Sequence, residues 1–416
     1  MNKDLLPYLH IALPVLNEAE LLPRLLECLL HQDYDRFRLY VCVNQPGEWW
    51  EDPEKRKICE TNAETLQLLQ HFNEFEIKVI DRTTPGNGWT GKKHGVGWAR
   101  KTAMDEACMH AGGNDIMVSL DADTTFGDTY LSSLAENFAA HPDAVALAVP
   151  YFHKLTADKN IDRAILRYEI YMRCYSLNLW RIGSPYSFTA LGSAMACPVW
   201  AYRAVGGMTP KMSGEDFYFL QKLRKYGKML FHNEEKVYPE ARFSDRVYFG
   251  TGPAMIRGNN GDWSGYPVYS FHYFDEIRET TAHFDDYFKE TKSTPVVDFI
   301  RQQLNEEDPF RLLRENFKET GQFVRACHEK FDGLRILQYL KYRQKDNTFS
   351  DEECLLEYLE RFYPGTGRDE LTTHLKDLSF ERSDTEDLDK LRLFLLQKEE
   401  EYQANSVPSL PGQQLP

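Results

Sequence analysis

The sequence predicts an α/β fold in which helices flank a Rossmann-like, mostly parallel sheet, followed by an all-helical C-terminal appendage. Two patterns carry this prediction. Over residues 9–149, short apolar runs alternate with segments of helical spacing. From residue 293 onward, the pattern is helical. Alternation of strands and helices at this spacing implies right-handed crossovers between parallel strands.

The expected elements follow in chain order. Five short apolar or β-branched runs are expected to be strands: 9–14, 38–43, 76–80, 115–120 and 144–149. Six segments with helical apolar spacing are expected to be helices: 18–30, 54–72, 94–110, 128–140, 161–179 and 216–226. Ligands of parallel sheets bind beyond the carboxyl ends of the strands. We therefore expect functional residues just after Pro14, Val43, Ile80 and Leu120.

Four regions are expected along the chain. They are a catalytic domain at 1–255, a connecting or lid segment at 256–292, a helical region at 293–403 and a disordered tail at 404–416. The tail is rich in Pro, Ser and Gln, which favours disorder. Within the helical region, Thr294 precedes a proline suited to the first helical position. Ser350 and Glu353 have the spacing of a capping box.

The composition argues against several classes of protein. The 416-residue chain has a formal net charge of −15, which disfavours the basic face that nucleic-acid binding requires. Its eight cysteines form no C-x-x-C pair, so a zinc ribbon is unsupported and a reducing compartment fits best. No stretch of about 20 apolar residues predicts a transmembrane segment, and no signal peptide is apparent. We expect a cytoplasmic protein, for which peripheral membrane contact stays open.

The first candidate site is Asp121-Ala122-Asp123, directly after an expected strand. On extended backbone, residues i and i+2 point the same way, so both carboxylates would face one cleft. Two carboxylates suit a hard divalent cation such as Mg²⁺ or Mn²⁺. The alternative is a pair of solvated turn residues.

A glycine-rich segment at 86–101 is the second candidate. Its glycines allow close approach of the backbone to a ligand, and Lys92 and Arg100 are among its basic residues. The start of the following helix would add N–H groups that favour anions. The segment is interpreted as a diphosphate-facing loop, with a flexible surface loop as the alternative.

Glu215 and Asp216 open an expected helix and form the third candidate. Acidic residues at a helix start often serve only as dipole partners or caps. A carboxylate near a bound cation can also accept the proton of an attacking hydroxyl. The cation would meanwhile stabilise charge on a departing diphosphate.

Five motifs occur in an order that resembles glycosyltransferase family 2, the inverting enzymes of the GT-A fold. They are PVLNEAE at 14–20, GVGWARK at 95–101, LDADTTF at 120–126, LGSAMACPVWAYRAVGGM at 191–208 and GEDFYFLQKLRKYG at 214–227. The resemblance implies transfer of a sugar from a nucleotide-diphosphate sugar to the hydroxyl of a saccharide or other acceptor. It also implies a divalent cation, Mg²⁺ or Mn²⁺, as cofactor.

The resemblance also implies roles for matched residues. The residues implied or interpreted to bind the nucleotide sugar are Pro14, Leu16, Asn17, Glu18, Asn44, Lys92, Arg100, Asp121 and Ala122. Asp121 and Asp123 match the family's metal and diphosphate aspartates. Asp216 matches the general base, with Glu215 beside it. Gly192 and Ser193 match a turn beside the acceptor.

The sequence departs from the family pattern at several places. Asn44-Gln45 stand where members usually have an aspartate that holds the nucleobase. Members often have a histidine as third metal ligand, for which Asp245 is the expected substitute and His232 the alternative. No Q-x-x-R-W motif is present, which favours transfer of one sugar per reaction over processive synthesis.

Aromatic residues before the fourth motif offer a platform for the acceptor, because sugar rings stack on aromatic faces. Trp180, Tyr186 and Phe188 are expected in a loop and are the preferred candidates. Aromatic residues at helical spacing are more often core, which is the interpretation favoured for Tyr168 and its neighbours. The segment 242–252 is either a lid whose arginines reach the diphosphate or an ordinary basic turn.

The sequence therefore predicts an inverting, metal-dependent, non-processive glycosyltransferase of hexosyltransferase type. Two alternatives stay open: a nucleotidyltransferase with a related sheet, and a non-catalytic scaffold with a degenerate transferase fold. The task of the helical C-terminus is also open, and self-association into a homo-oligomer is one of its candidate roles.

Overall fold

The computed structural model describes residues 6–245, 250–364 and 378–405. The chain divides into two compact units. Unit 1 comprises residues 1–157 and 189–256, and unit 2 comprises residues 158–188 and 257–416. The expected tail at 404–416 lies outside the described residues beyond position 405.

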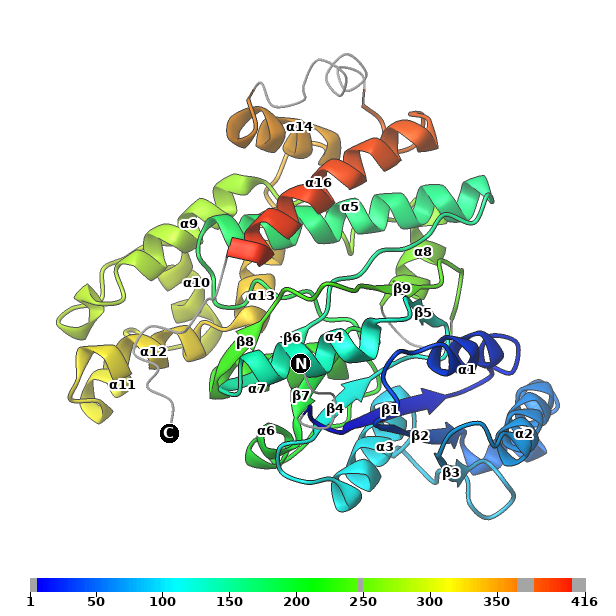
Figure 1. The fold of residues 1–416 in the computed structure, drawn as a ribbon. Coiled ribbons are helices and arrows are strands. Elements are labelled where there is room, and N and C mark those ends of the chain that lie inside the picture. The colour runs from blue at the N-terminus through cyan, green and yellow to red at the C-terminus, as the bar shows by residue number, and fades with distance from the viewer. Residues whose placement is uncertain (1–5, 246–249, 365–377, 406–416) are drawn as a thin grey trace. The chain divides into compact units, whose positions relative to one another are not determined.

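Unit 1 is built on a seven-stranded sheet with the order β3-β2-β1-β4-β7-β6-β8 (Figure 1). The strands are β1 (Leu9–Val15), β2 (Phe37–Asn44), β3 (Ile77–Arg82), β4 (Ile116–Ser119), β6 (Ala144–Ala148), β7 (Met195–Pro198) and β8 (Lys228–Leu230). Strands β1 to β4 pair in parallel, and β6 pairs in parallel with β8. Only β7 runs antiparallel to its neighbours within this sheet. The prediction of a mostly parallel, Rossmann-like sheet is confirmed.

The apolar sequence of the central strands explains their position. Every residue of β1 is buried, as expected for a parallel strand covered on both faces. The register pairs Val15 of β1 with Val43 of β2, so the two strands end at the same edge of the sheet. On the other side of β1, Ala12 pairs with Ser119, the last residue of β4. Residue 121 therefore emerges at this same carboxyl edge.

The helices of unit 1 flank the sheet (Figure 1). They are α1 (Leu22–Leu30), η2 (Gly47–Glu51), α2 (Arg56–His71), α3 (Val96–His110), α4 (Tyr130–Ala140), α6 (Val199–Ala204) and α7 (Glu215–Tyr226). Helix α8 (Thr251–Asn259) begins in unit 1 and continues past residue 256, the last residue of that unit. Helix α3 packs on β1 and β2, and α7 packs on β6. Gly97 permits a close approach in this layer, because a Cβ there would lie 2.2 Å from the carbonyl oxygen of Lys211. This contact brings α3 against the start of α7.

A second, two-stranded sheet joins β5 (Thr124–Phe126) to β9 (Val237–Pro239) in antiparallel pairing. These two strands, and also β7 and β8, are not among the strands expected from the sequence pattern. Each has only three or four residues. Such runs are too short for a period of two to be distinguished from chance.

Unit 2 is helical. Its elements are α5 (Lys159–Arg181), α9 (Phe271–Ala282), η3 (Asp286–Phe288), α10 (Pro295–Leu304), α11 (Arg311–Asn316), α12 (Thr320–Lys330), α13 (Gly333–Gln344), α14 (Asp351–Phe362) and α16 (Thr385–Asn405). Helix α16 runs alongside α5 (Figure 1). The apolar core between helices includes Ile170 and Leu177 of α5 with Leu391 and Leu395 of α16.

The division into units differs from the expected regions in two respects. Helix α5 was expected within the catalytic domain, but it groups with the helical unit. The physical reason is its apolar face, which packs against a helix more than 200 residues later in the chain. The expected connecting segment at 256–292 contains α9 and η3 and belongs to the same helical unit.

The helix starts expected in this unit are confirmed. The Thr294 side chain accepts a hydrogen bond from the backbone N–H of Val297, and Pro295 occupies the first helical position. Ser350 and Glu353 form a reciprocal capping box at the start of α14. Each cap satisfies N–H groups that have no partner inside the helix.

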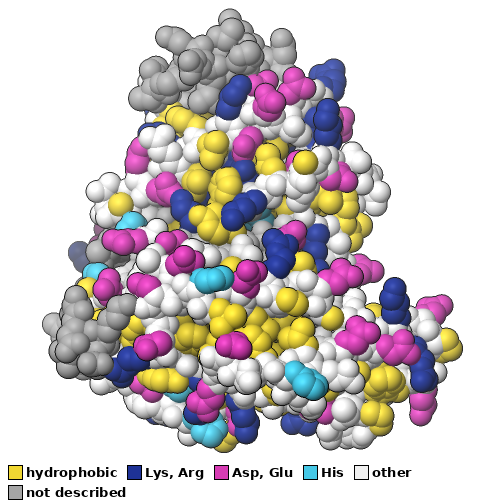
Figure 2. Space-filling model, turned by 45° about the vertical axis from the view of Figure 1, so that its right-hand side comes forward, with side chains coloured by type: hydrophobic (Ala, Val, Ile, Leu, Met, Phe, Trp, Pro, Cys, Tyr) yellow, Lys and Arg dark blue, Asp and Glu magenta, His cyan; other side chains and the backbone are white. Residues whose placement is uncertain are grey.

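The surface carries side chains of both charges, and the cysteines are unpaired. Figure 2 shows acidic and basic side chains interspersed over the face in view. All eight cysteines are free thiols. Among the described residues, no helix combines the length and the apolar character needed to cross a membrane.

Candidate active site

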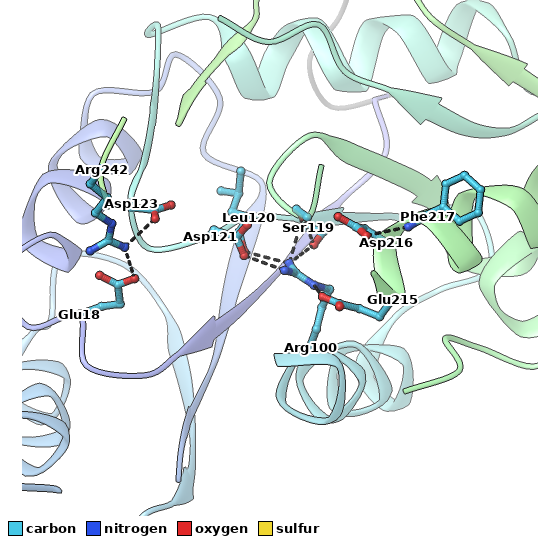
Figure 3. A network of polar contacts seen from close by, with 11 residues as sticks. Glu18, Arg100, Ser119, Leu120, Asp121, Asp123, Glu215, Asp216, Phe217 and Arg242 are labelled. Atoms are coloured by element: carbon cyan, nitrogen blue, oxygen red, sulfur yellow. Dashed lines mark hydrogen bonds and ion pairs between the residues drawn. The ribbon is translucent and has the colours of Figure 1, made fainter. Parts of the chain in front are cut away.

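Arg100 is the centre of a buried polar cluster at the carboxyl edge of the sheet (Figure 3). It lies on α3, and its side chain is 2% exposed. Nε donates to Oε1 of Glu215 at 3.1 Å, and Nη2 donates to Oδ1 of Asp121 at 2.7 Å. One guanidinium thus joins the D-x-D motif after β4 to the acidic start of α7, 94 positions later in the chain.

The remaining contacts of Arg100 come from Nη1. This nitrogen donates to Oγ of Ser119 at 2.7 Å and to the carbonyl oxygen of Gly192 at 3.0 Å. Burial alone would lower the pKa of Arg100, but the carboxylates of Asp121 and Glu215 raise it above its ordinary value. The arginine therefore stays charged and fixes both carboxylates.

Gly192 makes this cluster sterically feasible. A Cβ at position 192 would lie 2.3 Å from Nη2 of Arg100 and 3.0 Å from Oδ2 of Asp121. The carbonyl oxygen of Gly192 also accepts a hydrogen bond from Ser119 at 2.6 Å. Gly192 and Ser193 are both buried. Glycine is required here because a side chain would displace the arginine.

Asp121 and Asp123 do not project from extended backbone, as the sequence analysis assumed. Residues 122 and 123 form a turn, closed by a hydrogen bond from the N–H of Thr124 to the carbonyl oxygen of Asp121. The two carboxylates consequently contact different arginines, Asp121 with Arg100 and Asp123 with Arg242. Burial and the neighbouring Asp121 raise the pKa of Asp123, against the opposing charge of Arg242.

A second cluster surrounds Arg242. Its Nη2 donates to Oδ2 of Asp123 and to Oε1 of Glu18, each at 2.6 Å. The pairing of β5 with β9 brings these residues together, because it continues into a hydrogen bond from the N–H of Glu240 to the carbonyl oxygen of Asp123. In Figure 3, Asp121 lies between this cluster on the left and Asp216 on the right.

Glu215 and Asp216 have different surroundings, although they are adjacent in the chain. Glu215 is buried at 3% exposure and is held by Arg100. Asp216 is more accessible, and its Oδ1 accepts a hydrogen bond from the backbone N–H of Phe217 at 2.7 Å. Burial and the charge of Glu215 raise the pKa of Asp216 to about 7. Asp216 is thus the group of this pair that can exchange a proton near neutral pH.

The donor chemistry of Asp121 and Asp123 fits a hard divalent cation, which takes oxygen ligands and often keeps positions for phosphate and water. A complete set of protein ligands is not assembled. Among the described residues, no three His, Cys, Asp or Glu side chains form a group that could hold a metal. Asp245 is exposed and does not join Asp121 and Asp123 in such a group. Its role as a third metal ligand stays a prediction, which this geometry does not support. Arg242, three residues earlier, lies against Asp123 instead.

Asn44 and Gln45 are buried in an internal hydrogen-bond network at the end of β2. The amide of Asn44 donates to the carbonyl oxygen of Val15 at 2.9 Å and accepts from the indole N–H of Trp89 at 3.2 Å. Gln45 accepts from the amide of Asn62 at 2.8 Å. The amide nitrogen and the amide oxygen of Asn44 are therefore both hydrogen-bonded within the protein. This does not support the interpretation of Asn44 as a nucleotide ligand.

The other residues interpreted as nucleotide ligands differ in accessibility. Pro14 and Ala122 are buried, whereas Leu16 is half-buried and Lys92 is exposed. Asn17 is exposed and adopts a left-handed backbone with φ of 56°, and its N–H donates to Asn62 at 2.8 Å. This conformation is uncommon outside glycine. It turns the chain after β1 towards the buried Glu18.

The aromatic candidates for the acceptor lie in unit 2. Trp180 belongs to α5, not to a loop, and its ring stacks on Tyr402 at a centroid distance of 6.3 Å. Tyr186 is 2% exposed and donates to the carbonyl oxygen of His328 at 3.0 Å. Phe188 is also buried. The assignment of Trp180 and Tyr186 to the acceptor stays a prediction, and their burial does not support it.

Two contributions to the site escaped the sequence analysis. Ser119 is expected only as part of a strand, and Arg242 only within a segment that is either a lid whose arginines reach the diphosphate or an ordinary basic turn. No local signal identifies either residue, because their partners lie 19 to 224 positions away in the chain. The resemblance did single out Arg100, but as a nucleotide ligand and not as the link between two acidic motifs.

Comparisons with known proteins add only distant likenesses. No protein-family profile matches the sequence, and no curated protein does. Two similar solved structures are S. aureus TarS 1–349 in complex with UDP-GlcNAc and a mannosyltransferase from Pyrobaculum calidifontis in complex with GDP-Man and Mn²⁺. The first is 13% identical, with a TM-score of 0.40 and coverage of 82% of this chain and 93% of the other. The second is 15% identical, with a TM-score of 0.34 and coverage of 94% and 88%. Likenesses at this level carry no functional conclusion.

Proposed function

We propose that this chain is an inverting glycosyltransferase of the family 2 type that transfers one sugar from a nucleotide-diphosphate sugar to an acceptor hydroxyl. One observation carries the proposal: the buried Arg100 joins Asp121 to Glu215, which brings Asp216 beside the D-x-D motif. Ligands of such sheets bind at this carboxyl edge. Carboxylates there suit a diphosphate donor that is bound through a divalent cation, and a further carboxylate suits an acceptor hydroxyl that must lose its proton.

Asp216 acts as the general base in this proposal. Its pKa of about 7 lets it take up the proton of the acceptor hydroxyl as the oxygen attacks the anomeric carbon. Glu215 is held by Arg100 and stays buried, so it serves as a fixed charge beside the base. In this proposal the acceptor oxygen attacks the anomeric carbon directly from the face opposite the departing diphosphate, so that the anomeric configuration inverts.

The donor diphosphate is proposed to lie against Asp121 and Asp123. A divalent cation, Mg²⁺ or Mn²⁺, would be held by these two carboxylates and would neutralise charge on the departing diphosphate. Arg100 keeps Asp121 oriented, and Gly192 leaves room for that contact. Hexosyl transfer, the cytoplasmic location and a homo-oligomer through unit 2 belong to the same proposal and rest on the sequence alone.

The proposal is tested by a thermal-shift screen of nucleotide-diphosphate sugars, each with and without Mn²⁺. We expect one nucleotide class to raise the melting temperature, and more so with the cation. Incubation of that donor with saccharide acceptors should then release a nucleoside diphosphate and give a product of inverted anomeric configuration by NMR. Release of pyrophosphate would instead identify a nucleotidyltransferase. The absence of a shift with every nucleotide would favour a scaffold.

A further inference from the structure

Arg242 lies beside the D-x-D motif because of the short β5–β9 sheet. Thr124, directly after Asp123, pairs with Pro239, the last residue of β9. The N–H of Glu240 then bonds to the carbonyl oxygen of Asp123 at 3.0 Å. Arg242, two residues after Glu240, is therefore held next to the carboxylate of Asp123.

The guanidinium of Arg242 bridges two acidic side chains through one nitrogen. Nη2 is 2.6 Å from Oδ2 of Asp123 and 2.6 Å from Oε1 of Glu18. Glu18 is 5% exposed, so its charge is poorly solvated and is stabilised by the contact. The arginine consequently occupies a position between two carboxylates where a small divalent cation would also be stabilised.

Arg242 has unused hydrogen-bonding capacity. Both of its hydrogen bonds leave from Nη2, and its Nε is buried without a hydrogen-bond partner within the described part of the chain. Its side chain is 26% exposed, in contrast to Arg100, which is enclosed and donates from all three nitrogens. A guanidinium with free N–H groups and partial exposure is suited to bind phosphate oxygens in a bidentate manner.

We propose that Arg242 binds the diphosphate of the donor and that, without donor, it holds Asp123, one of the two carboxylates proposed for the cation. This inference rests on the proposed function and names a donor-binding residue for it. Arg242 and a divalent cation then compete for the carboxylate of Asp123. When a diphosphate enters, it offers Arg242 new acceptors, and the carboxylate of Asp123 becomes available to the cation.

The test uses Mn²⁺ alone and metal-free pyrophosphate as probes of the full chain. In the variant Arg242→Gln, Mn²⁺ measured by electron paramagnetic resonance should bind about tenfold more tightly than in the wild type, because the competing cation is gone. Calorimetry should show pyrophosphate binding weakened about 10–100-fold, the effect of losing charge-assisted hydrogen bonds. Arg242→Lys keeps the positive charge but loses the forked guanidinium that can bind two oxygens at once. Its affinities for Mn²⁺ and pyrophosphate should therefore lie between those of the wild type and of Arg242→Gln.

The matched control is Arg24→Gln. Arg24 pairs with Glu240 at 3.1 Å on the surface of the same unit, so its loss should leave both probes unchanged. The proposal stands if every Arg242 variant that folds shifts Mn²⁺ and pyrophosphate binding in opposite directions while Arg24→Gln shifts neither. Any other combination overturns it. If Arg242→Gln does not fold, Arg242→Lys is judged alone by the same criterion. These probes report binding without turnover, so the outcome is separate from that of the nucleotide-sugar screen.

Discussion

Each unit buries an arginine between carboxylates. The two networks differ in whether every carboxylate is buried or one of them is exposed to solvent. In unit 2, Arg173 of α5 contacts Glu169 and Glu399, and Ser176 donates to the same Glu399. The side chains of these three charged residues are at most 2% exposed, so the network is closed on all sides. In unit 1, Arg100 is equally buried, but the side chain of its partner Asp121 is 32% exposed.

This difference separates a network that holds helices together from one that offers chemistry. The unit 2 network joins α5 to α16, two helices that are distant in the sequence. Its polar groups bond to one another within the protein. The unit 1 network holds one side of Asp121 and leaves the other side accessible, next to an Asp216 with a raised pKa. Burying a charge is unfavourable unless the charge is paired. A partly exposed carboxylate beside a buried charge network therefore marks a candidate site.

The largest expected effect concerns the base. Asp216→Asn removes the proton acceptor and should lower kcat by about 10²–10⁴-fold while donor binding stays intact. Steady-state turnover and calorimetric donor binding check this. Asp128→Asn changes an exposed aspartate of the same unit and is the matched control, with turnover unchanged. Near-normal turnover of Asp216→Asn would remove the base assignment.

The closed network should respond through stability alone. Arg173→Met removes the cation that Glu169 and Glu399 share and leaves Glu169 with Arg392 at 3.4 Å. The loss should cost about 3–5 kcal/mol in urea unfolding. Donor binding should be unchanged wherever the variant is folded. The control Arg311→Met breaks the exposed pair with Glu315 and should cost at most about 1 kcal/mol. Equal losses for both variants would contradict the distinction between a closed and an exposed pair.

The open network should respond to a single added methyl group. Gly192→Ala places a Cβ 2.3 Å from Nη2 of Arg100, so Arg100 or the turn must move. Overpacking of this kind costs about 1–3 kcal/mol of stability, and displacement of Asp121 should also lower kcat. Thermal unfolding and turnover measure the two effects. Gly113→Ala has no atom within 4 Å of the new Cβ and should leave both unchanged; if the two variants behave alike, Gly192 has no steric role.

The smallest expected effect is the dependence of stability on pH. Because the pKa of Asp216 is raised to about 7 in the folded protein, the folded state binds one proton more than the unfolded state between about pH 4 and pH 7. Stability should therefore fall as pH rises through this window, by about 1.4 kcal/mol for each unit of the pKa difference before solvent screening reduces it. Asp216→Asn should lose this dependence, so its melting temperature should exceed that of the wild type more at pH 8 than at pH 4.

The same titration predicts the pH profile of turnover. Activity should rise with pH through about 7 as Asp216 loses its proton. A profile that is flat between pH 6 and pH 8, with a stability difference that is also flat, would show that the carboxyl group does not titrate there.

The sequence by itself determined the elements and the motifs. Mostly apolar runs, expected as strands at 9–14 and 38–43, form the buried parallel strands at 9–15 and 37–44. The expected bounds of α2 and α3 differ from the observed ones by at most two residues. Caps at Thr294 and Ser350 are local signals, because donor and acceptor lie within three residues of one another. These features depend on short-range periodicity and hydrogen bonding, which the sequence records directly.

Only the tertiary structure decided which acidic groups share a partner. The link from Asp121 through Arg100 to Glu215 and the approach of Arg242 to Glu18 connect positions that are distant in the chain. The grouping of α5 with the C-terminal helices is of the same kind. Such contacts follow from strand order, sheet register and the room that Gly97 and Gly192 leave, and no local pattern encodes those. The physical reason is that packing of separate elements sets these distances, whereas the sequence specifies each element mainly through its near neighbours.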